Sequence, residues 1–314
     1  MRDDSPDDWA AAQPDGFADL LTGAIDVHVH GQPDLATALP NRGDDLGVLR
    51  LAQRYGLAGW VLKSHLWPTT DRAALLQRAA GPDFTVRGSF TLNPTLGGVC
   101  PTVVELAAAH GATVIFLPTW GAAADVDRDG YVTTLLRRIA PSLDGFADER
   151  SVRVVDGDGR LTGAARETLD ACAERGLSVG TGHLGLAEST AVVEYCAAIG
   201  HDRVLVTHPL HYVDDAAELR RFTDTGALVE LAAAPLLHPE GHLHVRDLAR
   251  AVHVLGPDRL VLSSDVFSRW VPPEPECLRV VAEQLRHLGV EPPALHRMLA
   301  VNPRRFLGLD QEPP

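Results

Sequence analysis

The chain has 314 residues, of which 45% are hydrophobic and 22% are charged, and this length suits one large domain such as a closed barrel of alternating strands and helices. Its net charge of −14 argues against nucleic acid as the main partner, because no basic stripe is available to displace the counterions of a polyanion. No run of eighteen apolar residues occurs, which argues against a membrane partner or a membrane-spanning helix.

The segment 1–22 is acidic and lacks the apolar core of a signal peptide, so we expect an N-terminal extension ahead of a single domain at 23–310. Four cysteines show no CxxC spacing and predict neither a thiolate zinc site nor a disulfide framework. These features favour a cytoplasmic protein. The sequence leaves the oligomeric state open, with a homo-oligomer as one candidate.

The first predicted strand, residues 24–30, reads AIDVHVH. Apolar residues alternate with Asp26, His28 and His30, so we expect these three side chains on one face of the strand. Two imidazoles two residues apart on a strand face can chelate one metal ion, and neutral histidine suits zinc and its neighbours. The alternative is a strand with two chance histidines.

The second predicted strand, residues 58–65, reads AGWVLKSH and follows a helix that ends at Gly56. Lys63 and His65 share one face, with His65 at the carboxyl end. Lys63 is the only lysine beside 27 arginines, which indicates a position where arginine cannot substitute. A partly buried lysine can lose its proton and act as a nucleophilic or carboxylated amine, whereas arginine stays protonated. Chance survival of one lysine is the alternative.

Strands and helices continue to alternate up to residue 119, and the regular order then stops. We expect helices at 71–80 and 101–111 and strands at 84–93 and 112–119. The strand at 112–119 ends without an acidic residue, histidine or lysine. We interpret residues 120–160 as an insertion on the barrel rim, either a lid or a surface excursion, in which VRVVDGDGRLT predicts a hairpin with a DG turn.

Regular order then resumes through four more strands. We expect these strands at 177–183, 203–209, 227–233 and 259–265, separated by helices at 186–200, 214–226 and 244–255, after a helix at 163–176. Eight strands alternating with helices predict an α/β fold, the closed (β/α)8 TIM barrel, whose active site lies at the carboxyl ends of the strands. A doubly wound open sheet is the second choice, because no phosphate-binding glycine motif follows the first strand.

Residues of metal-ligand type gather at these strand ends. A single histidine after a strand is usually a surface or core residue, but seven such residues at one end of a barrel predict a metal centre. They suit a divalent metal, zinc first with manganese or iron as alternatives. The seven are His28, His30, Lys63, His65, His183, His208 and Asp265.

The ordered set resembles the amidohydrolase superfamily. The resemblance lies in HVH on the first strand, His183 on the fifth, His208 in THP, Asp265 in SSD and the ending ALHRMLAVNPRRFLGLD, which is similar to an NPxRxLGL signature. It implies a metal-dependent hydrolase in which His28, His30 and Asp265 bind one metal. His183 and His208 would bind a second metal or orient the substrate.

The chain departs from the superfamily's common form at one place. A carboxylated lysine usually bridges two metals from the fourth strand, but ATVIFLPT offers none, and Lys63 and His65 lie on the second strand. There GWVLKSH looks like the TDH element of the polymerase and histidinol phosphatase class of metal hydrolases. Lys63 could be a carboxylated bridge, a free amine that contacts substrate or a hydrogen-bond partner of a ligand, and the metal count is one or two.

The predicted activity is hydrolysis of a small molecule at an amide, lactam or other carbon–nitrogen bond, or an ester-type bond, by metal-activated water. Asp265 would accept the proton of that water, and His208, His211 or His65 would assist the developing oxyanion. Asp26 is interpreted as a supporting residue and Glu230 as a rim residue. A metal-dependent decarboxylase or other lyase on the same barrel and a non-catalytic metal-binding protein are the alternatives.

Overall fold

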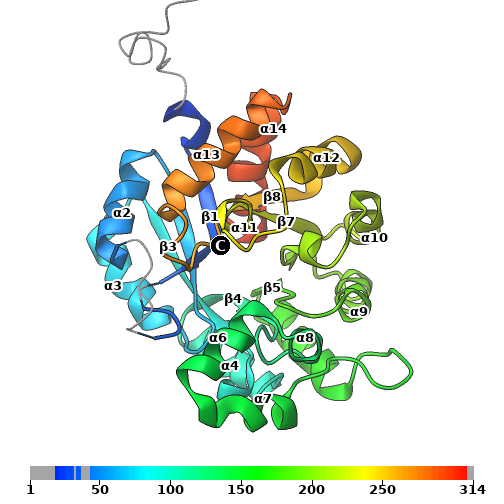
Figure 1. Cartoon of the computed structure of the whole chain (residues 1–314). Coiled ribbons are helices and arrows are strands. Elements are labelled where there is room, and N and C mark those ends of the chain that lie inside the picture. Colours follow the sequence, from blue (N-terminus) through cyan, green and yellow to red (C-terminus); the bar gives the residue numbers. More distant parts are fainter. Residues whose placement is uncertain (1–17, 32, 37–42, 310–314) are drawn as a thin grey trace, which may run out of the picture.

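The computed structural model describes residues 18–31, 33–36 and 43–309. Eight parallel strands form one sheet in the order of the sequence, and helices surround them (Figure 1). The predicted (β/α)8 barrel is therefore confirmed. The strands are β1 (Ile25–His30), β2 (Gly59–Lys63), β3 (Thr85–Thr91), β4 (Ala112–Phe116), β5 (Ser178–Gly180), β6 (Val204–Val206), β7 (Leu228–Ala232) and β8 (Leu260–Ser263).

The barrel closes where β8 meets β1. The backbone N–H of Asp265 donates to the carbonyl oxygen of His28 at 3.0 Å, and the hydroxyl of Ser264 donates to the same oxygen at 3.2 Å. These bonds hold Ser264 and Asp265, the two residues after β8, directly beside His28 of β1. Closure therefore fixes the position of Asp265 relative to the first-strand histidines.

The course of β1 differs from the prediction at Asp26. Ile25 and Val27 belong to the apolar cluster that fills the barrel, so strand alternation turns Asp26 to the opposite face. The pairing of β1 with β2 shifts register between Asp26 and Val29. Because such a bulge inserts one residue, His28 and His30 then face the barrel interior while Asp26 does not. The expectation that all three share one face is wrong.

The helices that cover the strands pack an apolar stripe on the sheet and leave the other face in solvent. In α12, for example, Leu248, Ala251 and Val252 are buried. The predicted helix at 214–226 is shorter, a 3-10 turn at Ala216–Leu219 followed by α10. The covering helices are α2 (Asp45–Arg54), α3 (Thr70–Ala80), α4 (Pro101–Ala109), α8 (Gly163–Glu174), α9 (Leu186–Ala198), α10 (Arg220–Thr223), α12 (Val245–Leu255) and α13 (Glu274–His287).

The insertion between β4 and α8 is mostly helical. It contains α5 (Ala123–Asp127), α6 (Tyr131–Ile139) and α7 (Asp144–Arg150), drawn in green in Figure 1. The predicted hairpin is reduced to one antiparallel bridge between Val155 and Leu161. Its turn is closed by Asp156, whose side chain accepts the N–H groups of Asp158 and Arg160.

The C-terminal segment 292–306 packs against the end of the barrel where β8 begins. After α14 (Pro292–His296) come a π-helical turn at Arg297–Val301 and α15 (Asn302–Phe306). The amide of Asn302 donates to the carbonyl oxygens of Pro257 and Leu260 at 2.8 and 2.7 Å, which ties the segment to the start of β8. Within the described ranges, no helix combines the length and apolar character that a bilayer crossing requires. Residues 1–17 of the predicted extension lie outside these ranges.

Candidate metal centre

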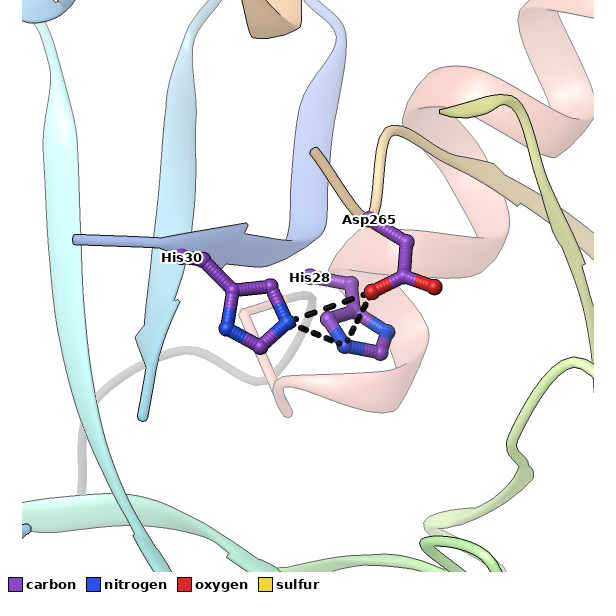
Figure 2. Close-up of side chains that lie close together, drawn as sticks. All are labelled: His28, His30 and Asp265. Atoms are coloured by element: carbon purple, nitrogen blue, oxygen red, sulfur yellow. Dashed lines mark hydrogen bonds and ion pairs between the residues drawn. The ribbon is translucent and has the colours of Figure 1, made fainter. Parts of the chain in front are cut away.

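Three side chains converge at the carboxyl end of the barrel (Figure 2). The Nε2 atoms of His28 and His30 lie 3.2 Å apart. Asp265 Oδ1 lies 3.0 Å from the first and 3.2 Å from the second. All three side chains are buried or nearly so, with Asp265 the most exposed at 14%.

The far side of each imidazole is held by a carboxylate. His28 Nδ1 lies 2.8 Å from Glu230 Oε1, and His30 Nδ1 lies 2.9 Å from Asp34 Oδ2. A carboxylate accepts hydrogen bonds, so each Nδ1 carries the proton and donates it. In its neutral form, each ring presents an Nε2 lone pair toward the other Nε2 and toward Asp265. Three electron-rich atoms that face one another fit a shared cation.

The spacing of these atoms suits zinc. Ligands about 2.0–2.1 Å from a tetrahedral ion lie about 3.3 Å from one another. The three observed separations are 3.0, 3.2 and 3.2 Å. Carboxylates behind metal-bound imidazoles also recur in zinc sites, where they fix the tautomer and raise ligand basicity.

The local electrostatics favour positive charge at the same point. Burial by itself would lower the pKa of His28, but the charges of Asp265 and Glu230 raise that pKa to about 9, so a bound cation would displace a proton from His28 Nε2. Burial likewise works against ionisation of Asp265, yet His28 and His30 hold the pKa of Asp265 well below its usual range. The centre therefore keeps an ionised carboxylate and attracts a cation.

The backbone is unusual at two of the predicted site residues. Asp265 has φ 52° and His208 has φ 28°, in the left-handed region that residues with a Cβ rarely adopt. His208 is held by its N–H, which donates to Glu230 Oε2 at 3.1 Å. Such strain persists only where surrounding bonds impose it, and it concentrates at functional sites.

A second group of histidines lies beside the first. The ring of His65 is 4.6 Å from that of His30 and 5.8 Å from that of His183, and the His183 and His208 rings are 5.1 Å apart. His208 Nε2 lies 3.9 Å from Asp265 Oδ2. Burial lowers the pKa of His65, His183 and His208, so these imidazoles are neutral at pH 7.

Lys63 is buried inside the barrel, opposite His30 in the pairing of β1 with β2. Its Nζ lies 5.4 Å from the ring centroid of Phe116, the last residue of β4, and has no hydrogen-bond partner among the described residues. Burial lowers the pKa of Lys63, against the opposing charges of Asp265 and Asp34. The side chain thus reaches from the second strand toward the fourth.

All seven predicted residues come together at this end of the barrel, and their roles as ligands stay predictions. The sequence did not predict the carboxylates that form hydrogen bonds to the site histidines. Glu230, interpreted as a rim residue, is fully buried and bonded to His28, and Asp125 Oδ1 lies 3.1 Å from His183 Nδ1. Asp34 bonds His30 four residues earlier, and its other oxygen accepts the N–H of His65 at 2.9 Å.

A cavity of about 380 Å³ opens above this group. Asp265, His65, His183 and His208 are among the residues that line it. The insertion contributes residues 128–132 to the wall. These four candidates are therefore accessible to a small molecule, whereas His28, His30 and Lys63 are buried and do not line the cavity.

Solved structures that share this fold include a protein named as an amidohydrolase and one named as an organophosphorus hydrolase, so the predicted resemblance is confirmed at the level of the fold. An amidohydrolase from Pseudomonas aeruginosa is 14% identical with a TM-score of 0.60, and the match covers 93% of this chain and 96% of that one. The organophosphorus hydrolase from Deinococcus radiodurans is 16% identical with a TM-score of 0.57, over 93% of this chain and 94% of that one.

No curated protein matches the sequence. A family model described as "Family of unknown function (DUF6282)" matches residues 23–230, which is more than half of the chain. The match takes in β1 through the Glu230 position on β7 and so includes most of the predicted site residues. The chain belongs to this family, DUF6282.

Proposed function

We propose that the protein is a metal-dependent hydrolase that cleaves an amide, lactam or other carbon–nitrogen bond, or an ester-type bond, in a small molecule. One observation carries the proposal: three potential ligand atoms, two of them on imidazoles backed by carboxylates, meet beside a cavity that Asp265 lines. Zinc suits these ligands best, with manganese or iron as alternatives and one or two ions per chain.

A divalent ion bound by His28, His30 and Asp265 would lower the pKa of a bound water to about 7 and polarise the scissile bond. Asp265 has a second oxygen for proton transfer, because Oδ1 faces the two histidines while Oδ2 lies toward His208. The carboxylate is ionised at neutral pH, and we assign its Oδ2 to accept a proton from water and pass it to the leaving group.

The neutral histidines supply N–H donors on the other side of the substrate. His208 Nδ1 is buried with no partner among the described residues, and burial keeps the pKa of His208 well below 6.5. A neutral imidazole can donate to an oxyanion without bringing a charge that repels the ion. We assign this role to His208, with His183 and His65 orienting the substrate or holding a second ion.

Lys63 completes the proposed site as a carboxylated or neutral amine. A protonated ammonium with no hydrogen-bond partner in a fully buried position is energetically costly, which favours either uncharged or carboxylated nitrogen. Since Nζ lies near the end of β4, the lysine reaches the side of the barrel where the fourth strand itself offers no ligand.

The reaction class can be tested with zinc-loaded protein and matched aryl lactones, esters and amides, each also bearing a free carboxyl group, in water enriched in ¹⁸O. A hydrolase must place solvent oxygen in the product carboxylate, so we expect one label per turnover and no turnover in a His28→Ala control. Release of carbon dioxide from a carboxylic acid substrate, with no solvent oxygen in the organic product, would contradict hydrolysis and indicate a decarboxylase.

A further inference from the structure

The cavity above the metal centre has one strong cation in its wall. Its lining within the described residues includes several histidines and carboxylates but a single arginine, Arg128, and no lysine. Arg128 follows α5 in the insertion, and about a third of its side chain is exposed. An accessible guanidinium in a substrate cavity is a candidate binding group for an anion.

The guanidinium is held in place from two directions. Arg128 Nη2 donates to Asp125 Oδ1 at 2.6 Å. The guanidinium carbon lies 3.9 Å from the centroid of the Tyr212 ring, so the flat group rests on that ring. The ion pair engages Nη2, and the Tyr212 side chain is a further hydrogen-bond partner of the guanidinium. About a third of the Arg128 side chain stays exposed for a ligand. Fixation of the guanidinium lowers the entropy lost when a ligand binds.

The same carboxylate joins Arg128 to the metal centre. Asp125 Oδ1 also lies 3.1 Å from His183 Nδ1, and its Oδ2 accepts the hydroxyl of Thr133 at 2.8 Å. Arg128 and His183 are therefore positioned by one buried side chain. A molecule that reaches the floor of the cavity meets Arg128 at its wall.

The remaining wall near Arg128 is largely aromatic. The Tyr131 ring lies 5.8 Å from that of Phe267 and 5.3 Å from that of His238, and all three residues line the cavity. Flat aromatic faces suit a planar or ring-shaped molecule. The cavity therefore joins a metal-ligand floor, an aromatic wall and one fixed cation.

We propose that Arg128 binds a carboxylate of the substrate remote from the bond that is cleaved, so that the substrates are compact, ring-containing carboxylic acids. The statement that these molecules are substrates rests on the proposed function, whereas the binding of a carboxylate by Arg128 does not. The planar guanidinium matches the two oxygens of a carboxylate, and its fixed position selects molecules whose acid group lies at one distance from the reacting end.

The test measures binding rather than turnover, so it stands even if hydrolysis fails. Zinc-loaded protein is titrated by calorimetry with benzoate and with the three benzenedicarboxylates, which sample three spacings between acid groups. In wild type, at least one dicarboxylate should bind about 10-fold or more tightly than benzoate, because it adds one charge-assisted contact. Arg128→Met should abolish this preference and leave benzoate binding unchanged.

The control is Arg153→Met, which removes a charge from the same insertion. Arg153 forms an exposed ion pair with Asp127 and does not line the cavity, so the preference should survive there. Three results would overturn the proposal: no dicarboxylate preference in wild type, a preference that persists in Arg128→Met, or an equal loss of benzoate and dicarboxylate binding in that variant. The last would show that Arg128 only positions Asp125.

Discussion

Asp265→Asn is expected to lower kcat by about 10²-fold or more while the protein stays folded. The asparagine side chain keeps one oxygen for the position near the Nε2 atoms of His28 and His30. It cannot accept a proton at the second position, where Asp265 Oδ2 now lies toward His208. Kinetics at saturating zinc, with the melting temperature and zinc content measured in parallel, separate this loss from loss of metal.

A matched control exists at the opposite end of β8. Asp258 precedes β8, forms an ion pair with Arg297 and is 77% exposed, so Asp258→Asn should have little effect on kcat. Near wild-type turnover in Asp265→Asn would remove the carboxylate from the proton transfer. A loss in both variants would indicate a general effect on β8 instead.

Lys63→Met is expected to abolish turnover and to leave the melting temperature equal or higher. Methionine has nearly the length of lysine and no polar group, so it removes a buried nitrogen that has no hydrogen-bond partner in the described structure. Activity should therefore fall while stability does not, as expected where a site residue is retained at a cost in stability.

Lys63→Arg and Lys63→Glu separate the roles of the amine. Guanidinium can neither take up carbon dioxide nor act as a neutral amine, so Lys63→Arg should be inactive although it keeps the charge. Recovery of activity in Lys63→Glu would favour a carboxylated bridge, whereas loss in both would favour an amine that contacts substrate. Wild-type activity in Lys63→Met would refute any functional role.

The barrel and the seven strand-end residues could be predicted because the signal is periodic. In AIDVHVH and GWVLKSH, residues of metal-ligand type follow apolar residues at the carboxyl end of the strand, and parallel strands bring those ends together. The structure gathers His30, His65 and Asp265 in this way. Topology alone accounts for that part of the site.

The orienting carboxylates could not be predicted by the same means. Glu230 lies 202 residues from His28, and Asp125 lies in an insertion whose helices the sequence did not reveal. The bulge that turns Asp26 away from His28 also leaves no mark on the alternation of AIDVHVH. Pairing across distant elements depends on three-dimensional closure, which a local pattern does not encode.

The central claim is that His28, His30 and Asp265 hold a divalent metal, and zinc content after loading and desalting tests it most directly. Wild type should retain about one to two equivalents per chain, His28→Ala should lose most of it, and the exposed His253→Ala should match wild type. Equal zinc in wild type and His28→Ala, or none in either, would contradict the account.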